Sequence, residues 1–311
     1  MSVDRTPYPS YEGEVQLYLQ KEDPEGMAIE NHMDEDQQQR QKRDLTAQDT
    51  WPLYRYRWWI REYVAEFFGS FFLLSFGIGV TATTTFHAGN TASFQTNVSY
   101  LAITLGWGFG LAIALFITMG VSGGHLNPAV TLANCAFGAF PWRKAPGFML
   151  AQLLGAILGA ANVYGLFKQH FDDAGVMLLP NETMASKFSG VFVTYPNVSN
   201  VFAVWSEIFN TMVLMMGILA INDNRMTPAD GYKPVAVGLL LFVIGITTGI
   251  NSGYALNPTR DLGPRIFTAM LWGKEPFTLH GYYFWIPIVG PIAGALLGMF
   301  LYVFCIIPSG A

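Results

Sequence analysis

The sequence GGHLNPAV at residues 123–130 has a counterpart in the second half of the chain, SGYALNPTR at residues 252–260, and the fold is organised around this pair. Each contains a glycine turn, a leucine and an Asn-Pro pair that opens a short apolar run. One Asn-Pro pair is an ordinary helix start, with Asn as the cap and Pro at the first helical position. Two of them, at matching places in two hydrophobic halves, indicate helices broken inside a membrane, where bare backbone is tolerated only around a cavity.

The composition places most of the chain in lipid. Of 311 residues, 51% are hydrophobic and 13% are charged, which is too apolar for a soluble domain of this length. Residues 1–50 hold 12 of the 22 acidic and 5 of the 17 basic residues, which leaves 10 acids and 12 bases for residues 51–311. We therefore predict a disordered acidic tail at 1–50 and a membrane domain at 51–307, with no basic face for nucleic acid.

Six hydrophobic segments are long enough to cross a bilayer, at about 20 residues each. They cover approximately residues 60–86, 98–119, 146–167, 200–221, 233–251 and 283–307. The two Asn-Pro runs, 127–138 and 257–271, are too short to cross and are predicted to be re-entrant half-helices. Because each half has an odd number of spans, three, the second half is inserted upside down relative to the first. The predicted fold is an all-α membrane protein with six transmembrane helices and two half-helices, in an inverted repeat of about 58–170 and 198–307.

Charged residues predict the orientation in the membrane. An aromatic and arginine-rich stretch at 51–61 precedes the first span, which places the N-terminus, and after six spans the C-terminus, in the cytoplasm. The basic joints at 143–144 and 225–233 then also fall on the cytoplasmic side. Three Asn-X-Ser/Thr sequences, at Asn97, Asn181 and Asn197, all fall in outer joints and are candidate N-glycosylation sites.

A glutamate occurs about one turn into the first span of each half. These residues are Glu66 in AEFFG and Glu207 in SEIFN. A carboxylate that faces lipid costs a few kcal/mol, so both are expected to point inward. In this interpretation each accepts hydrogen bonds from the backbone of its re-entrant loop and holds the loop open. The alternative is a glutamate near the interface that reaches water.

The inverted repeat brings the N-termini of the two half-helices together near the midplane. Each N-terminus carries unpaired N–H groups and a partial positive charge of roughly half an elementary charge. We expect the side-chain oxygens of Asn127 and Asn257 to cap the half-helices while their NH2 groups face the lumen. Such a centre favours the oxygen of a neutral molecule and repels a cation or an excess proton.

These motifs, together with Thr194-Tyr195-Pro196 and the run from Leu256 to Arg265, make the chain resemble the major intrinsic proteins, or aquaporins, and among them the aquaglyceroporins. The resemblance covers about residues 60–307. It implies a homotetramer in which every subunit has its own pore, and half-helix dipoles are a known selectivity device of aquaporins. The implied pore motifs are Asn127, Pro128, Ala129 and Asn257, Pro258, Thr259.

The resemblance also implies an outer constriction made by Trp107, Gly245, Tyr254 and Arg260. Gly245 stands where water-only members commonly have His, so the pore is expected to be wider and less polar on one side. Trp107 and Tyr254 would pack against the carbon backbone of a polyol, while Arg260 donates to its hydroxyls. Asp261 is a further mark of the subclass and is expected to pair with a neighbour such as Arg265.

The second motif departs from the family pattern, since it reads Asn-Pro-Thr rather than Asn-Pro-Ala. Thr259 is β-branched and carries a hydroxyl, near the start of a half-helix where crowding is felt. Asn257 and Pro258 remain, so the cap and the dipole are expected to survive. The width of the lumen at its centre is the property that Thr259 puts in question.

The expected function is a passive membrane channel that conducts glycerol, water and other small uncharged solutes, excludes ions and protons, and needs no cofactor or metal. A secondary transporter also uses broken helices, but it normally needs ionisable residues at mid-depth for coupling. A non-conducting member of the same fold, acting in adhesion or signalling, is a second alternative. An enzyme is not expected: His125 lacks a paired nucleophile or metal ligand and is expected to brace its loop. The plasma membrane is the expected location.

Overall fold

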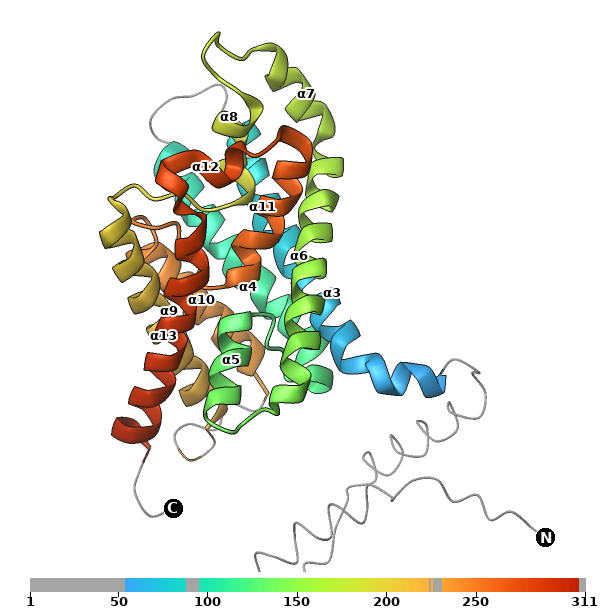
Figure 1. The fold of residues 1–311 in the computed structure, drawn as a ribbon, viewed down its shortest axis with the longest axis vertical. Helices are drawn as coiled ribbons and strands as arrows, with labels where there is room; N and C mark the ends of the chain where they lie inside the picture. Colours follow the sequence, from blue (N-terminus) through green and yellow to red (C-terminus); the bar gives the residue numbers. More distant parts are fainter. Residues whose placement is uncertain (1–53, 88–94, 224, 226–230, 308–311) are drawn as a thin grey trace, which may run out of the picture. The chain divides into compact units, whose positions relative to one another are not determined.

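The computed structural model describes residues 54–87, 95–223, 225 and 231–307 (Figure 1). The chain divides into two compact units, 1–57 and 58–311, and the description below concerns the second. The predicted tail at 1–50 lies outside the described residues. All regular secondary structure in the described part is helical.

Five helices in the described part are long and apolar enough to cross a membrane. These candidates are Tyr56–His87, Ser99–Ser122, Trp142–Leu166, Asn200–Asn222 and Glu275–Ile306. The remaining predicted span is a shorter apolar helix, α10 (Lys233–Thr248), of 16 residues. It ends three residues earlier than predicted because Gly249 caps it.

The two halves contain corresponding helices. In the first half these are α3 (Tyr54–His87), α4 (Gln95–Ser122), the half-helix α5 (Pro128–Ala136) and α6 (Ala145–Leu166). In the second half they are α9 (Asn200–Asn222), α10, the half-helix α11 (Pro258–Trp272) and α13 (Ile286–Leu301). A π-helical turn, η4 (Tyr302–Ile306), continues α13. The predicted order of three spans and one half-helix in each half is therefore observed.

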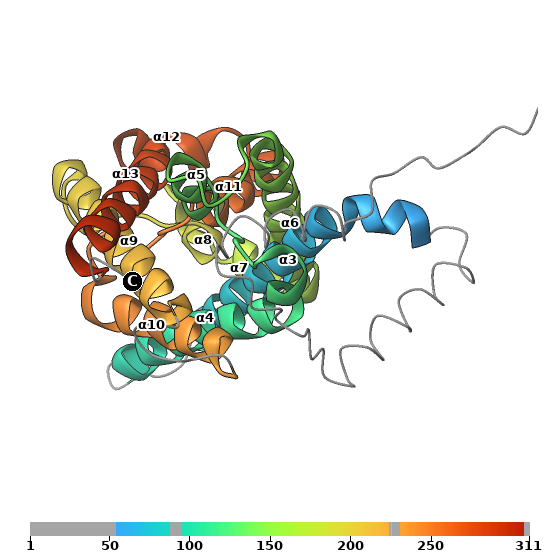
Figure 2. The same ribbon diagram turned by 90° about the horizontal axis from the view of Figure 1, so that it is seen from below.

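Seen along the bundle, the long helices follow one another around a ring in the order α13, α9, α10, α4, α3 and α6 (Figure 2). The half-helices α5 and α11 lie between α13 and α6, which closes the ring. Each half-helix contacts the last helix of the other half: α5 packs against α13, and α11 packs against α6. The two halves are thus interlocked.

Glycines repeat the same close contacts in both halves, which supports the internal repeat. A Cβ on Gly155 of α6 would lie 2.2 Å from the carbonyl oxygen of Phe67, and a Cβ on Gly294 of α13 would lie 2.3 Å from that of Ile208. Phe67 and Ile208 directly follow Glu66 and Glu207. In both halves the absent side chain therefore lets the third span approach the first at the level of the glutamate.

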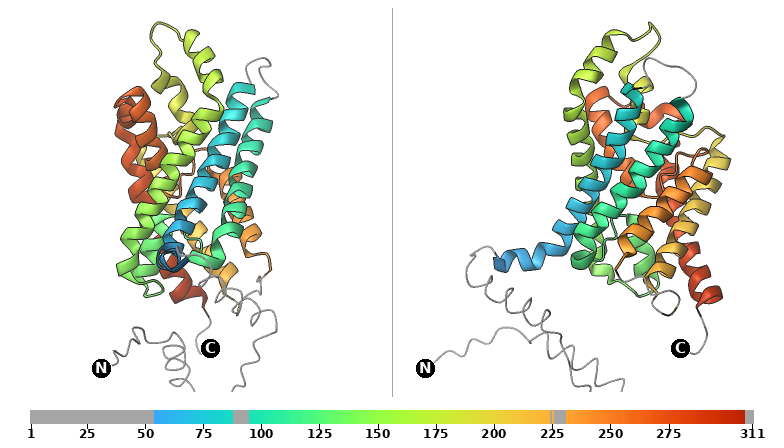
Figure 3. Two further views of the ribbon diagram at one scale, coloured as in Figure 1. Left: turned by 90° about the vertical axis from the view of Figure 1, so that its right-hand side faces the viewer. Right: turned by 180° about the vertical axis from the view of Figure 1, so that it is seen from behind.

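We call the end of the bundle where η4 finishes the inner end, and the opposite one the outer end. The half-helix α5 lies toward the inner end and α11 toward the outer end (Figures 1 and 3). Three short helices gather at the outer end: α7 (Lys168–Val176), α8 (Met184–Phe192) and α12 (Glu275–Tyr282). The spans predicted from hydrophobicity did not include them, because they are short and carry polar residues.

Candidate functional site

The two half-helices meet at their N-termini. The Nδ2 of Asn127 donates to the carbonyl oxygen of Leu256 at 2.8 Å, and the Nδ2 of Asn257 donates to that of Leu126 at 2.7 Å. Both leucines have left-handed backbones, with φ of 49° and 57°, which is costly for a non-glycine residue. The reciprocal hydrogen bonds help to offset this cost. Since each NH2 group has two hydrogens, one remains for a molecule in the lumen.

The side-chain oxygens of the same asparagines cap the half-helices. The Oδ1 of Asn127 accepts from the backbone N–H of Ala129 at 2.9 Å. The Oδ1 of Asn257 accepts three bonds, from the backbone N–H groups of Thr259 and Arg260 at 3.0 and 3.4 Å and from the Thr259 hydroxyl at 2.9 Å. The hydroxyl introduced by Thr259 therefore points back to the cap. Thr259 is not among the residues that line the central cavity.

The two glutamates support the loops from behind. Glu66 accepts from the backbone N–H groups of His125 and Leu126 at 2.9 and 2.7 Å. Glu207 accepts from those of Ala255 and Leu256, both at 2.9 Å. Each carboxylate is fully buried, and hydrogen bonds to the charged form stabilise it there. The structure thus places both glutamates inward, against the loops that carry the asparagines.

The first loop has an additional support from α6. Gln152 of α6 donates through Nε2 to Glu66 at 2.7 Å and to the hydroxyl of Thr131 at 3.2 Å. That hydroxyl lies 3.1 Å from Nδ1 of His125, whose ring packs edge-on against Phe140. His125 lines the lumen with one side and braces α5 with the other.

A narrow cavity runs past the meeting point of the half-helices. One side of its lining is formed by the two loops, including Gly124–Asn127 and Ala255–Asn257. The other side is apolar and comes from the long helices, through residues such as Leu73, Leu214 and Leu241. A second cavity toward the inner end shares His125 and Val130 with the first. The lumen therefore has one hydrocarbon wall and one wall of peptide groups.

Three of the four residues expected at the outer constriction line this cavity: Trp107, Tyr254 and Arg260. The Cζ of Arg260 lies 4.2 Å from the centre of the Trp107 ring, which is a cation–π contact. Its Nη1 donates to the carbonyl oxygen of Phe192 at 3.5 Å. The hydroxyl of Tyr254 is buried and makes no hydrogen bond within the described part of the protein.

Gly245 is not among the residues that line the cavity, but it lies directly against Tyr254. A Cβ at Gly245 would lie 3.1 Å from both Cε2 of Tyr254 and Cγ2 of Thr104. A side chain at this position would therefore press on the tyrosine ring. Gly77 of α3 has a comparable role for Trp107, because a Cβ there would lie 2.3 Å from the indole. The sequence motifs contain no signal for Gly77.

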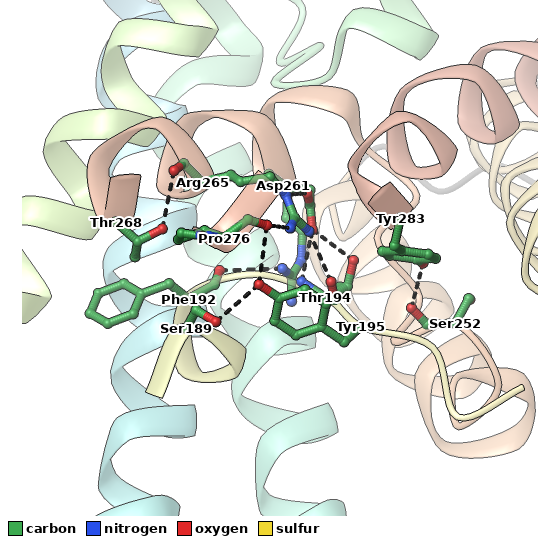
Figure 4. Close-up of polar contacts among 11 residues, drawn as sticks. Ser189, Phe192, Thr194, Tyr195, Ser252, Asp261, Arg265, Thr268, Pro276 and Tyr283 are labelled. Carbon is green, nitrogen blue, oxygen red and sulfur yellow. Dashed lines mark hydrogen bonds and ion pairs between the residues drawn. The ribbon is translucent and has the colours of Figure 1, made fainter. Parts of the chain in front are cut away.

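A buried polar network is built around Asp261, the residue that follows Arg260 (Figure 4). Asp261 accepts from Nε of Arg265 at 2.7 Å, and both side chains are almost inaccessible to solvent. This is the expected pairing of Asp261 with Arg265. Both residues also bind Thr194, the first residue of the Thr-Tyr-Pro motif, and Arg265 donates to the carbonyl oxygen of Pro276. The network ties α11 to the segment that follows α8.

Two broken helices that meet inside a bundle of long apolar helices, beside a lumen with one polar wall, define a membrane channel class. The model of the family described as "Major intrinsic protein" matches residues 54–302. The chain is 44% identical over 248 residues to Aquaglyceroporin-3 of Trypanosoma brucei brucei, and the matched region covers 78% of this chain and 77% of that protein. It is 39% identical over 254 residues to human Aquaporin-9, with 79% and 82% covered. The X-ray structure of the aquaglyceroporin from Plasmodium falciparum superimposes with a TM-score of 0.71 at 32% identity, covering 80% of this chain and 97% of that chain.

The chain belongs to the major intrinsic protein family. Its resemblance to aquaglyceroporins, its fold and its placement in a membrane are thereby confirmed. The family assignment also makes it a channel rather than an enzyme.

Proposed function

We propose that the protein is a passive channel for glycerol, water and other small uncharged solutes, and that it excludes ions and protons. The observation that carries this proposal is the reciprocal pair of hydrogen bonds between Asn127 and Leu256 and between Asn257 and Leu126. It places two donor groups and two helix N-termini at one point of the lumen. The names of the relatives, several of which are aquaglyceroporins, support glycerol as a solute.

The outer constriction suits a polyol. Trp107 and Tyr254 offer aromatic faces to a carbon chain. The guanidinium of Arg260 and the hydroxyl of Tyr254, which has no hydrogen-bond partner among the described residues, offer hydrogen bonds to hydroxyl groups. Beyond it, the hydrocarbon wall accepts the carbon chain while the loops supply polar groups. The solute exchanges its bulk hydration for contacts along one wall, in single file.

The centre of the lumen opposes cations. With roughly half a positive charge at each helix N-terminus, a monovalent cation about 5 Å from both would be repelled by about 3 kcal/mol at an effective dielectric constant of about 20. Loss of hydration adds to this barrier. A neutral oxygen instead accepts from the free N–H groups of Asn127 and Asn257. The helix N-termini therefore repel a cation at the same place where the two asparagine side chains attract a solute oxygen.

Stopped-flow light scattering on proteoliposomes, run in parallel for water and glycerol, tests the proposal. We expect both permeabilities to exceed those of empty liposomes and the glycerol flux to remain linear with concentration. Arg260→Ala should raise the cation leak, measured in liposomes or oocytes. Proteoliposomes no more permeable than empty ones to either solute would refute the channel.

Secondary transport is disfavoured by the surroundings of the buried carboxylates. Glu66 and Glu207 are both occupied by backbone N–H groups of the loops that they support. A carboxylate engaged in this way is not available to bind and release a coupling ion. Glycerol flux that follows its own gradient and ignores imposed Na⁺ or H⁺ gradients decides for the channel.

We also propose a homotetramer in the plasma membrane with both termini in the cytoplasm, as expected for a member of this family. Of the candidate glycosylation sites, Asn181 and Asn197 are exposed at the outer end, and Nδ2 of Asn197 donates to Ile250. Asn97 lies in the first turn of α4. A glycosidase-induced mobility shift tests occupancy, and labelling of these sites from the cytoplasm would overturn the topology.

A further inference from the structure

We infer that Thr194, which is not among the residues that line the central cavity, is the positioning residue that sets the outer constriction and thereby the preference for glycerol over water. This inference rests on the proposed function. It assigns a specificity role to a residue of the segment that follows α8.

Every polar group of Thr194 is held by the Asp261–Arg265 pair. The Oδ2 of Asp261 accepts from both the backbone N–H and the hydroxyl of Thr194, each at 2.7 Å. The Nη2 of Arg265 donates to the Thr194 carbonyl oxygen at 2.9 Å (Figure 4). Thr194 is 4% exposed, so water does not compete for these bonds. The segment is therefore fixed to α11 at this residue.

Thr194 is connected to Arg260 through Phe192. The Phe192 carbonyl, two residues before Thr194, accepts from Nη1 of Arg260 at 3.5 Å, which is long for a hydrogen bond. The intervening Val193 is extended, with φ −121° and ψ 167°, so a displacement of Thr194 is carried to Phe192. A small shift therefore decides whether Arg260 keeps this acceptor.

Thr194 is connected to Tyr254 through Gly253. A Cβ on Gly253 would lie 2.9 Å from Cβ and 3.0 Å from Cγ2 of Thr194. Thus the threonine side chain packs directly on the backbone that precedes Tyr254. The hydroxyl of Tyr283 holds the preceding carbonyl, that of Ser252, at 2.8 Å. One threonine is consequently linked to the supports of two constriction residues, to Phe192 along the chain and to Gly253 by contact.

Loosening Thr194 should affect glycerol more than water. Arg260 already lies over the Trp107 ring at 4.2 Å. Without the Phe192 carbonyl, the guanidinium is expected to settle further onto the Trp107 ring and to cover the surface that a polyol carbon chain would use. Water needs no such surface. The ratio of glycerol to water permeability should therefore fall.

The test uses full-length protein in liposomes and measures that ratio by stopped-flow light scattering. Thr194→Val keeps the shape and the backbone bonds but removes the hydroxyl bond, and should lower the ratio about threefold or more, since sites are sensitive to small displacements. Thr194→Ser keeps the hydroxyl bond but loses the Cγ2 contact with Gly253, so its ratio should lie between those of Thr194→Val and wild type. Thr278→Val is the matched control, because its hydroxyl donates to the carbonyl of Glu275 at the outer end and should leave the ratio unchanged.

The ratio separates positioning from folding, because fewer folded channels lower both permeabilities together. An unchanged ratio in Thr194→Val would overturn the inference. If that variant is not recovered folded, Asp261→Asn is measured in the same way, because it weakens the same bonds to Thr194. An unchanged ratio in Asp261→Asn would also overturn the inference. Wild-type protein that conducts neither solute refutes the proposed function itself, whereas wild-type flux with an unchanged variant ratio refutes only the role of Thr194.

Discussion

Asn127 and Asn257 each donate a hydrogen bond to the residue that precedes the other, at Leu256 and Leu126. The exchange is reciprocal, but the caps are not equal, because Oδ1 of Asn257 accepts three bonds and that of Asn127 accepts one from the described residues. The second half-helix is therefore held more firmly at its tip than the first.

This inequality predicts different costs for two equivalent substitutions. Asn257→Ala and Asn127→Ala each remove a cap, worth about 1 kcal/mol, and leave a buried leucine carbonyl unpaired, at a cost of about 1–3 kcal/mol. Asn257→Ala also frees the N–H of Arg260 and should lower the melting temperature further. Thermal unfolding in detergent measures the difference. An equal or smaller loss for Asn257→Ala would contradict the inequality.

Gly77 and Gly79, both on α3, form a matched pair. A Cβ at Gly77 would lie 2.3 Å from the Trp107 ring, whereas a Cβ at Gly79 would meet nothing within 4 Å. We expect Gly77→Ala to push the indole into the lumen and lower glycerol permeability about fivefold or more, because a displacement of about 1 Å at a site is costly. Gly79→Ala should leave glycerol permeability unchanged. Equal permeabilities in both variants would show that Trp107 does not depend on Gly77.

Gln152→Leu tests the extra support of the first loop. It removes the donor to Glu66 at 2.7 Å and should destabilise the protein by about 1.5–3 kcal/mol, as expected for a hydrogen bond to a charged group. Asn162→Leu, an exposed amide on the same helix, is the control and should cost less than about 0.5 kcal/mol. Thermal unfolding of both variants in one detergent measures these costs, and similar losses would argue against the support.

Thr259→Ala should be mild. The variant loses one of three bonds to Oδ1 of Asn257, worth about 0.5–1.5 kcal/mol, and Thr259 does not line the central cavity. Water and glycerol permeability are therefore expected to stay within about twofold of wild type, as measured by stopped-flow light scattering. Loss of tetramers or of all flux would contradict this expectation.

Asp223, just after α9, predicts a pH dependence of stability. The Arg225 side chain donates to both of its oxygens at 2.8 Å, and the hydroxyl of Tyr302 donates to one of them at 3.1 Å. These bonds, those of Arg225 first, lower the pKa of Asp223 well below its ordinary value. A lowered pKa stabilises the folded state above the unfolded pKa of about 3.9 and less as the pH falls below it.

The difference in melting temperature between wild type and Asp223→Asn should therefore be constant from about pH 5 to 8 and shrink below about pH 4. Asp172→Asn, at an exposed ion pair with Lys168, is the control and should show little difference at any pH. A difference in melting temperature that grows as the pH falls would contradict the lowered pKa of Asp223.

The sequence predicts the parts of this site that have local signals. Asn-Pro at a helix start, a carboxylate inside an apolar span and the order of spans are all visible in short stretches. For that reason the half-helices, the inward glutamates and the repeat could be predicted. The direction of the Thr259 hydroxyl could not be predicted from the sequence, because the side-chain rotamer determines whether it faces the lumen or the cap.

Contacts between distant elements could not be predicted in this way. Gly77 beneath Trp107, Gln152 behind Glu66 and the Phe192 carbonyl beside Arg260 all depend on which faces of the helices meet. Membrane helices are apolar on most sides, so the periodicity that reveals a buried face in soluble proteins is weak. The helix α8 begins with a capping box, in which Thr183 and Ser186 cap it reciprocally, but with nine residues it is too short to span a membrane.

The interlocking of the halves also governs how the chain reaches its final form during synthesis. α5 ends at Ala136 and contacts α13, which begins only at Ile286. At about 5–20 residues per second, a ribosome needs on the order of 10 seconds to make the intervening chain. Throughout that interval the first half-helix has been translated but its closing partner has not. The newborn protein must therefore keep a polar re-entrant loop sheltered from lipid until the last helix arrives.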